Sequence, residues 1–463
     1  MAATTSSSAK LTFSTNLVFF DTVFVTQGSS VRIFTVHNNN SEAVVVSSIR
    51  VAGTSASFFN INVDGTPGPV VNNVKIPAKD SIYIFATVTV NPNNQNNPLV
   101  IQDSLVFTTN GNIQSVKLQA FGLNAYFFVP NKFPKYGPAY HLLSSSGDSN
   151  VWTTNSAGKP YVVFGYLLVP PGMTLNIQSG VNVYLHDSAV ILVDSGATLQ
   201  VAGTSAKPVN FQGDRLEPAY KTIPGQWNGI LLGPGSINNT ISWAVLQNGI
   251  TGIQADTVYN NNPTLKIDHT IVKSMSYYGL LGEGATIVAD DCVFADCQYS
   301  SVALYIGGNY QFYQCTFADY WGVDNSYGQR STPLLYLNNY YKSATNQTIE
   351  RAIKASFGNC IIYGALNEEI KFDSLYTTGD PMNYYFENCL IKTQSSFPAN
   401  HCNDSIYKNQ DPLFTNPSID DYNVANPGPA IGRGNATIST TYTIDLDGTQ
   451  RPQQQATLGA YER

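Results

Sequence analysis

The chain has 463 residues, of which only 12% are charged, and its formal net charge is -7. Such a composition offers no overall basic footprint for nucleic acid or for an anionic membrane. No run approaches the roughly 18 apolar residues of a membrane-spanning helix. The excess of tyrosine, asparagine, threonine and serine over lysine and glutamate is typical of a secreted or cell-surface β protein.

The first ten residues, MAATTSSSAK, have neither the basic head nor the apolar segment of a signal peptide. We expect that an export signal has been removed and that residues 1–10 form a flexible tether. An intracellular protein is the alternative. No cysteine precedes Cys292, so the start of this chain offers no residue for a lipid anchor.

Residues 11–125 contain short apolar runs separated by turn signals, among them LVFFDTVFV, SVRIFTVHN and SIYIFATVTV. This spacing, with Asn-Gly and Asp-Gly pairs in the turns, predicts an Ig-like β-sandwich. The segment YFFVPNKFPKYGP carries three prolines and marks a boundary. Residues 126–160 are therefore predicted to be a linker and the N-terminal cap of the next domain.

Residues 161–402 alternate apolar and polar positions between glycines, without a helical period. One column recurs at steps of 22 to 29 residues, with a single step of 45, and contains Ala244, Thr270, Cys292, Cys315, Cys360 and Cys389. An apolar residue follows each member two positions later. Positions that recur once per coil predict a right-handed parallel β-helix, whose neighbouring strands lie about 4.8 Å apart.

The cysteines of this column are interpreted as interior filling, because buried cysteine behaves as a small hydrophobic residue. Alanine and threonine share the column, which argues against a redox or metal role. The residue directly after each member is also apolar. Either the strand bends there or an outer layer covers it, and both alternatives stay open.

Residues 403–463 are predicted to form a C-terminal cap, because an open β-helix end would expose unpaired backbone groups. The segment contains NQDPLFTNPSIDDYNVANPGPAIGRG and ends near DLDGTQRPQQQATLGAYE. We expect four charged residues to fasten this cap, namely Asp445, Asp447, Arg451 and Glu462. The predicted fold class is therefore all-β: a sandwich, a β-helix and a cap.

Several segments together resemble a known architecture. VPPGMTLNIQSGVNVYLHDSAVILVDSGATLQVAGTSAKPVNFQGD, PGQWNGILL and the Asn-Cys coils resemble surface-exposed right-handed parallel β-helix proteins of the pectin-lyase-like superfold. VFFDTVFVTQGS and INVDG resemble the N-terminal part of the same proteins. The resemblance implies an exported lipoprotein on the extracellular face of a Gram-negative outer membrane, attached only through a lipid anchor that this chain lacks.

The superfold also includes polysaccharide lyases and glycoside hydrolases, so an enzyme is considered. The resemblance implies that a lyase would hold Ca²⁺ with clustered acids beside a base; the candidates are Asp290, Asp291, Asp296, Asp319, Asp324, Lys273 and Arg330. A hydrolase needs two carboxylates on one face. Asp296 and Asp319, four positions after the column on adjacent coils, are the candidate catalytic pair, with an outward non-catalytic pair as the alternative. No other cofactor and no metal site are predicted, since no histidine has zinc-ligand spacing.

An aromatic row is the stronger functional signal. If Gly279, Ser301 and Gly322 are equivalent turn positions, the tyrosines two places earlier stack on consecutive coils and can contact sugar rings. The candidate ligand-binding residues are Tyr277, Tyr278, Tyr299, Tyr320, Trp321 and Tyr327.

These observations predict a non-catalytic cell-surface protein that presents a long surface to a polysaccharide or to an outer-membrane protein. The rings could instead form an ordinary aromatic stack or a protein interface. The alternative functions are an extracellular lyase or hydrolase and a structural subunit of an outer-membrane complex.

Overall fold

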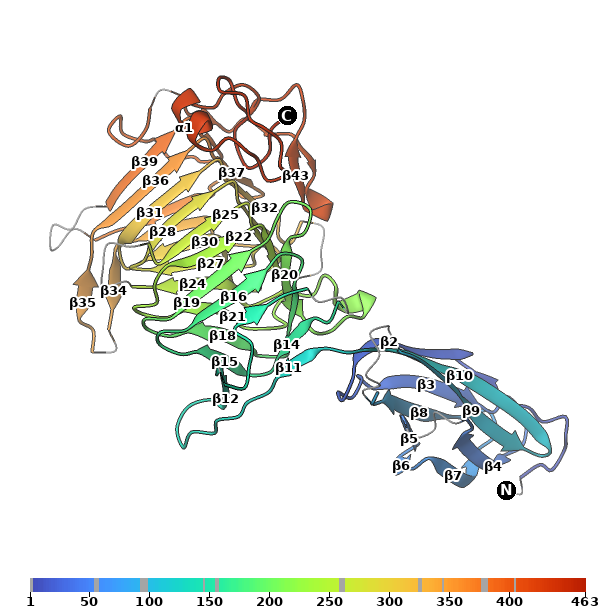
Figure 1. Ribbon diagram of the computed structural model, residues 1–463. Coiled ribbons are helices and arrows are strands. Elements are labelled where there is room, and N and C mark those ends of the chain that lie inside the picture. Colours follow the sequence, from blue (N-terminus) through green and yellow to red (C-terminus); the bar gives the residue numbers. More distant parts are fainter. Residues whose placement is uncertain are drawn as a thin grey trace. The chain divides into compact units, whose positions relative to one another are not determined.

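The computed structural model describes residues 3–53, 58–91, 99–144, 146–154, 158–257, 263–323, 327–343, 345–375, 382–403 and 405–463. They are almost entirely strands and divide into two compact units (Figure 1). The first unit is Met1–Tyr126 with two short later segments, and the second contains the rest of the chain. Within the described part of the chain, no helix combines the length and apolarity needed to cross a bilayer.

The first unit is a β-sandwich of two five-stranded sheets. One sheet contains β1 (Thr12–Phe13), β3 (Arg32–His37), β8 (Ser81–Val88), β5 (Phe59–Val63) and β6 (Thr66–Pro67) in that order. The other contains β2 (Leu17–Phe24), β10 (Asn112–Leu123), β9 (Leu99–Thr109), β4 (Val44–Val51) and β7 (Val70–Ile76). Alternate residues such as Val36 and Ile84 are fully buried, as the apolar/polar alternation requires.

Part of the segment that we expect to be a tether contacts this sandwich. The side-chain amide of Asn110 donates to the carbonyl oxygen of Thr4 at 3.0 Å, and that of Asn112 donates to Ser7 at 2.8 Å. Ala9 is buried. Because these amides satisfy its backbone acceptors, the segment is held along β9 and β10.

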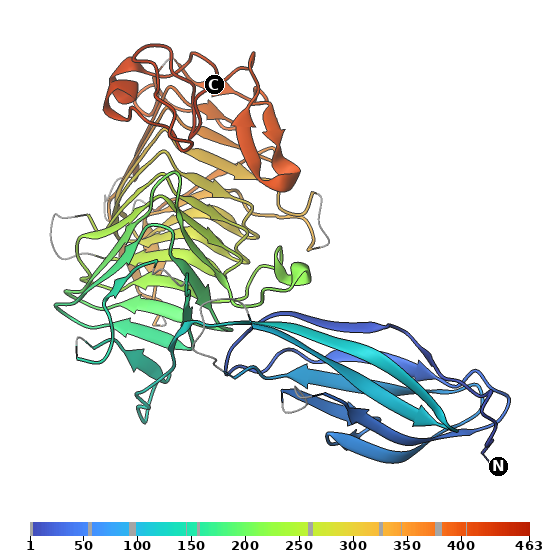
Figure 2. The ribbon, with the colours of Figure 1, turned by 45° about the vertical axis from the view of Figure 1, so that its right-hand side comes forward.

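The second unit is a right-handed parallel β-helix built from three sheets that stack coil on coil (Figure 2). The β23 sheet contains β11 (Tyr126–Phe128), β14 (Tyr161–Val163), β17 (Asn182–Leu185), β20 (Val209–Gly213), β23 (Ala244–Gln247), β26 (Ile271–Lys273), β29 (Val293–Ala295), β32 (Thr316–Asp319), β37 (Ile361–Gly364), β40 (Leu390–Ile391) and β41 (Tyr407–Lys408). The β27 sheet contains β12 (Tyr140–Leu142), β15 (Tyr166–Val169), β18 (Val190–Val193), β21 (Gly229–Leu232), β24 (Thr251–Asp256), β27 (Tyr278–Glu283), β30 (Ser300–Tyr305), β33 (Leu335–Asn338) and β38 (Ile370–Asp373). The β28 sheet contains β13 (Val151–Trp152), β16 (Thr174–Gln178), β19 (Thr198–Ala202), β22 (Asn239–Ser242), β25 (Leu265–Asp268), β28 (Thr286–Asp290), β31 (Gly308–Tyr313), β36 (Ile353–Gly358) and β39 (Met382–Glu387).

The column found in the sequence is confirmed as an interior ladder. Two positions after it, the residues paired coil by coil are Leu246, Val272, Phe294, Phe317, Ile362 and Ile391. Cys292, Cys315, Cys360 and Cys389 are free thiols with no exposed surface. Each buried phenylalanine in the neighbouring ladders contributes about 2–3 kcal/mol of hydrophobic stabilisation.

A left-handed backbone conformation explains why an acidic or amide residue precedes each cysteine. The six residues directly before the column have φ between 44° and 55°, namely Trp243, His269, Asp291, Gln314, Asn359 and Asn388. Asparagine, aspartate and histidine adopt this conformation more readily than most residues. A single such residue turns the chain from the β28 sheet into the β23 sheet.

The C-terminal segment supplies the outer layer that the sequence left open. Its residues Tyr422, Leu446 and Ala460 bury Val293 and Ala318 on the outer face of the β23 sheet. A second cluster, which includes Leu458, covers Ile361 and Leu390. The segment, which contains β42 (Phe414–Asn416), β43 (Asp421–Val424) and α1 (Ala436–Thr441), therefore lies along several coils as well as at the end of the β-helix (Figure 1).

The four predicted fasteners of this segment are confirmed. Arg451 forms ion pairs with Asp291 at 2.6 Å and with Glu462 at 3.3 Å. Asp445 accepts a hydrogen bond from the Glu462 backbone N–H at 2.8 Å, and Asp447 pairs with Arg463 at 2.6 Å.

Candidate functional site

The outer face of the β27 sheet carries a continuous row of tyrosines. Leu280, Leu304 and Leu337 of this sheet point into the β-helix core, so the residues that alternate with them face outward. The rings that pack together outside are Tyr277, Tyr278, Tyr299, Tyr305 and Tyr336, with Tyr340 at the start of β34 (Tyr340–Lys342). We call these six residues the tyrosine row.

Ring contacts link the row from coil to coil. Tyr277 stacks on Tyr299 with centroids 4.8 Å apart and an interplanar angle of 22°. Tyr278 contacts both, and its hydroxyl lies 3.1 Å from the Tyr305 hydroxyl. The Tyr305 ring continues to Tyr336 at 5.0 Å. Tyr277 remains 45% exposed, so the row offers an accessible ring face.

A carboxylate ends the row. Asp373, at the end of β38, accepts hydrogen bonds from the hydroxyls of Tyr336 and Tyr340, the latter at 3.1 Å. Burial raises the pKa of Tyr336 above its ordinary value, and its bond to Asp373 raises it further. The phenols therefore stay protonated and act as hydrogen-bond donors near neutral pH.

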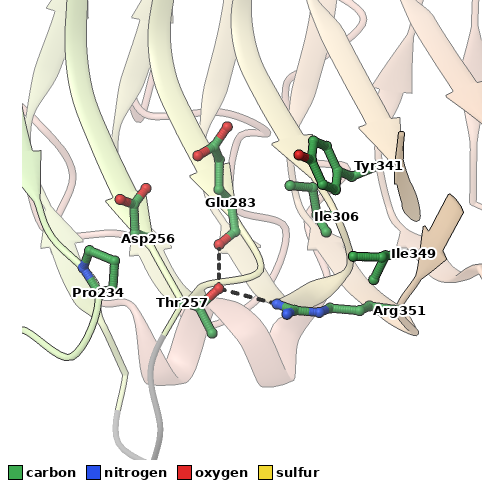
Figure 3. Close-up of a pocket in the computed structure, with 8 residues that line it drawn as sticks. All are labelled: Pro234, Asp256, Thr257, Glu283, Ile306, Tyr341, Ile349 and Arg351. Atoms are coloured by element: carbon green, nitrogen blue, oxygen red, sulfur yellow. Dashed lines mark hydrogen bonds between the residues drawn. The ribbon is translucent and has the colours of Figure 1, made fainter. Parts of the chain in front are cut away.

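A pocket of about 270 Å³ opens on the same sheet (Figure 3). Asp256 and Glu283, the last residues of β24 and β27, are paired across the ladder, and Glu283 is paired in turn with Tyr305 of the tyrosine row. Figure 3 shows both carboxyl groups pointing the same way from neighbouring strands. The pocket and the tyrosine row are thus parts of one surface.

Both carboxyl groups hold their protons more tightly than ordinary carboxyl groups do. The pKa of each is raised, mainly by burial. The neighbouring Asp256 charge raises the pKa of Glu283 further. The side-chain amide of Gln254 donates to both, at 3.0 Å and 3.4 Å.

The hairpin of β34 and β35 (Thr348–Glu350) forms the opposite wall of the pocket. Tyr341 and Ile349 from this hairpin are 43% and 42% exposed. Arg351 follows β35, and its guanidinium lies 3.3 Å from the Thr257 hydroxyl, which donates to the Glu283 carbonyl oxygen at 3.0 Å (Figure 3). The pocket therefore offers two acidic side chains, a cation and two exposed apolar contacts.

The predicted aromatic set divides into two groups. Tyr277, Tyr278 and Tyr299 belong to the tyrosine row, but Tyr320 does not. Because Val302 pairs with Leu335, the position one coil beyond Tyr299 is Thr332. The sequence analysis aligned Gly322 with Gly279 and Ser301. This alignment was wrong, because the connection between β32 and β33, residues 320–334, contains an insertion that shifts the equivalent position.

The remaining predicted aromatics lie within or beside that insertion. Tyr320 packs against Phe414 and Tyr422 of the C-terminal segment, with centroids 6.3 Å and 6.4 Å away. Trp321 is buried and packs against the exposed Tyr327 ring at 5.6 Å. These three rings stabilise the insertion and the outer layer.

The candidate catalytic pair, Asp296 and Asp319, lies within packed structure. Asp319 has no exposed surface; Arg330 lies 3.1 Å from one carboxylate oxygen, and Ser301 donates to the other at 2.8 Å. Asp296 accepts hydrogen bonds from the Tyr320 backbone N–H and the Tyr422 hydroxyl. Burial raises the pKa of both groups. Since protein groups occupy their oxygens, the pair serves the structure, and the expectation of a catalytic role is corrected.

The candidates for a Ca²⁺-dependent lyase do not converge either. Asp291 and Arg330 are buried in ion pairs, and Lys273 pairs with Asp420 at 2.6 Å. Asp290 lies on the outer face of β28, and Asp324 lies outside the described residues. Over the described ranges, no group of three or more His, Cys, Asp or Glu side chains is placed to hold a metal ion.

Sequence reasoning missed the acidic end of the site because it aligned turns rather than strand ends. The strands GIQAD, GLLGE, VALY, LYLN and IKFD end on Asp256, Glu283, Tyr305, Asn338 and Asp373, most of which are direct ladder partners. Each polar residue follows an interior apolar residue. Aligning the last outward position of each coil would have found this set.

A comparison with protein-family models agrees with the β-helix architecture. Residues 147–276 match the family model described as a pectate-lyase like beta helix domain. No curated protein matches the chain. One solved structure, a protein of unknown function from Porphyromonas gingivalis W83, matches at 15% identity with a TM-score of 0.19, over 25% of this chain. This chain spans about half, 52%, of that protein's length.

Two further solved structures are catalytic domains of a GH87 alpha-1,3-glucanase. The complex with tetrasaccharides matches over 79% of this chain and 82% of that chain, at 12% identity and a TM-score of 0.23. The complex with nigerose matches over 77% and 80%, at 11% identity and a TM-score of 0.20. At these TM-scores the likenesses carry no functional argument.

Proposed function

We propose that the protein binds a glycan chain along the tyrosine row and the adjoining pocket of the β27 sheet. The observation that carries the proposal is the continuity of ring contacts over three coils from Tyr277 to Tyr336, ending on the Asp373 carboxylate. Successive coils repeat at about 4.8 Å, close to the length of one sugar unit. An elongated polymer can therefore follow the β-helix axis.

The chemistry of the surface suits a carbohydrate. Tyrosine faces accept the CH groups of sugar rings, while the hydroxyls remain available for hydrogen bonds. Asp373, Asp256 and Glu283 offer carboxyl oxygens that can accept hydrogen bonds from sugar hydroxyls. The exposed Tyr341 ring on the hairpin provides a second platform beside the pocket.

Glycoside hydrolysis is the second candidate, and the raised pKa of Glu283 favours it. A carboxyl group whose pKa is raised keeps its proton to higher pH and can act as a general acid. The geometry is less favourable, because hydrolysis needs both carboxyl groups free to reach the sugar, whereas the Gln254 side-chain amide already donates to Asp256 at 3.0 Å and to Glu283 at 3.4 Å. Binding without cleavage is therefore the better-supported function.

Retention of the protein on a panel of immobilised polysaccharides, with measurement of new reducing and unsaturated chain ends, separates these functions. We expect retention without new ends, and about tenfold weaker retention for Tyr305→Ala, equivalent to about 1.4 kcal/mol. Tyr385→Ala is the matched control, because this exposed tyrosine lies on β39 of the β28 sheet.

If no polysaccharide retains the protein, or if Tyr305→Ala is retained as well as the wild type, the binding proposal fails. New chain ends that disappear in Glu283→Gln would replace it with hydrolysis. A location on the cell surface belongs to the same proposal, since long glycans are met outside the cell. Protease treatment of intact cells tests it, with loss of the protein as the expected result.

A further inference from the structure

The loop between β11 and β12 presents two aromatic side chains to solvent. Residues 131–138, NKFPKYGP, are exposed at every position. Phe133 is 77% and Tyr136 81% exposed, and among the described residues these are the two most exposed large hydrophobic side chains. Burying a phenylalanine is worth about 2–3 kcal/mol, so folding alone does not account for this arrangement. We call residues 129–139 the β11–β12 loop.

The base of this loop is closed by backbone hydrogen bonds. Lys132 and Tyr140 exchange both of their backbone bonds, at 2.9 Å and 3.0 Å, and the Leu142 N–H donates to the Asn131 side chain at 3.0 Å. The loop also contains three prolines, each of which fixes one backbone dihedral. Figure 1 shows it extending from β12 at the first coil of the β-helix. The aromatic tip is thus presented at low conformational cost.

The charge of the loop opposes that of the chain. Lys132 and Lys135 are exposed, and no aspartate or glutamate occurs from Ser104 to Gly147, whereas the whole chain has a net charge of -7. The Lys135 ammonium lies 5.2 Å from the centre of the Tyr136 ring. A basic, aromatic tip on an acidic protein selects an anionic partner.

We propose that the β11–β12 loop docks on an anionic phospholipid surface. Phe133 and Tyr136 enter the headgroup region, where aromatic rings are favoured, while the two lysines reach the phosphates. A single convex loop is too small for a stable protein interface, which needs about 800 Å² per partner. A bilayer requires no matching surface. A loop of this kind binds a membrane weakly and reversibly. Stable attachment therefore requires a second membrane-binding element.

Co-sedimentation of the full chain with vesicles tests the proposal. One vesicle set is phosphatidylcholine alone and the other contains about 30 mol% phosphatidylglycerol. We expect the wild type to bind the anionic set more tightly and to dissociate as salt is added. The double variants Phe133→Ser/Tyr136→Ser and Lys132→Glu/Lys135→Glu should each lower partitioning by about tenfold or more.

Matched controls are Tyr83→Ser and Lys354→Glu, which change exposed residues elsewhere and should bind like the wild type. All substituted side chains are exposed, so unchanged melting temperatures verify folding. The proposal is overturned if the wild type sediments with neither vesicle set. Equal binding to both sets, or full binding by either loop variant, overturns it as well.

Discussion

The interior column and the tyrosine row both recur once per coil of the β-helix. Only the column residues keep the same pairing between coils on the two sides of the insertion at residues 320–334. Thr316, one position after Cys315, pairs with Ile361 although residues 320–334 and the hairpin lie between them in the sequence. In the tyrosine row, Tyr299 is followed one coil later by Thr332, because the same insertion displaces Tyr320.

The difference has a physical cause. An interior residue must fill the space between two neighbouring coils, so strand positions are maintained whatever length of chain connects them. Residues in a connection are under no such constraint. Interior ladders therefore carry register across insertions, whereas aromatic residues near turns do not.

The largest expected effect breaks the anchor of the insertion. The Arg330 guanidinium lies 2.8 Å from both Glu369 oxygens and 3.1 Å from Asp319, with all three side chains buried. Arg330→Met leaves two buried carboxyl groups without their cation, so we expect a loss of about 3–5 kcal/mol in the free energy of unfolding, measured by chemical denaturation.

The pH dependence sharpens this test. The pKa of Glu369 is raised to about 7, chiefly by burial, so acidification neutralises the group that lost its partner. The loss in Arg330→Met should therefore be smaller at about pH 5 than at about pH 8. Lys354→Met, at an exposed position, should change stability by less than about 0.5 kcal/mol. Equal losses for the two variants would show that the insertion is not anchored in this way.

The sequence was sufficient to predict the interior but not the outer surface. Thr270 and Cys292 could be aligned because like stacks on like in every coil. Asp291 could be named only as a candidate acid of a lyase, because its partner Arg451 is 160 positions away in the sequence. The Asp256–Glu283 pair was missed because both acids are single residues at strand ends, and only the three-dimensional register brings them together.

A second prediction concerns Asp290 on the outer face of β28. Its pKa is raised from 3.8 to about 7, first by burial and then by the neighbouring Asp268 carboxylate. The folded state thus holds this proton more tightly than the unfolded state. The resulting stabilisation is complete below about pH 4 and is lost as the pH rises through about 7.

Asp290→Asn removes the ionisation, so we expect it to be roughly 2 kcal/mol more stable than the wild type at about pH 8.5. Below about pH 4, where the carboxyl group is protonated in both the folded and the unfolded state, the two proteins should melt together. A variant that is destabilised at both pH values would mean that Asp290 is ionised and paired in the folded state.

A third prediction separates Tyr277 from Tyr320, which the sequence placed in one row. Tyr277→Ala should weaken glycan retention about five- to tenfold and leave the melting temperature unchanged. Tyr320→Ala should do the reverse, because its ring packs under the C-terminal segment; we expect a loss of about 1–2 kcal/mol in stability. If both variants weakened glycan retention equally, the alignment predicted from the sequence, which places Tyr277 and Tyr320 in one row, would be supported.

The smallest expected effect tests the column itself. The Cys315 thiol donates to the Tyr313 carbonyl oxygen at 3.3 Å, and Thr270 in the same column donates to the Asp268 carbonyl at 2.7 Å. Cys315→Ser keeps a donor for that carbonyl, so it should cost less than about 1 kcal/mol. Phe317→Ser, two positions later in the neighbouring ladder, should cost at least about 3 kcal/mol, because it opens a cavity and buries a new hydroxyl. Chemical denaturation compares the two variants directly. Equal losses of stability in the two variants would mean that the Cys315 thiol does more than fill space. A residue that only fills space can be replaced by another small side chain that donates to the same carbonyl oxygen.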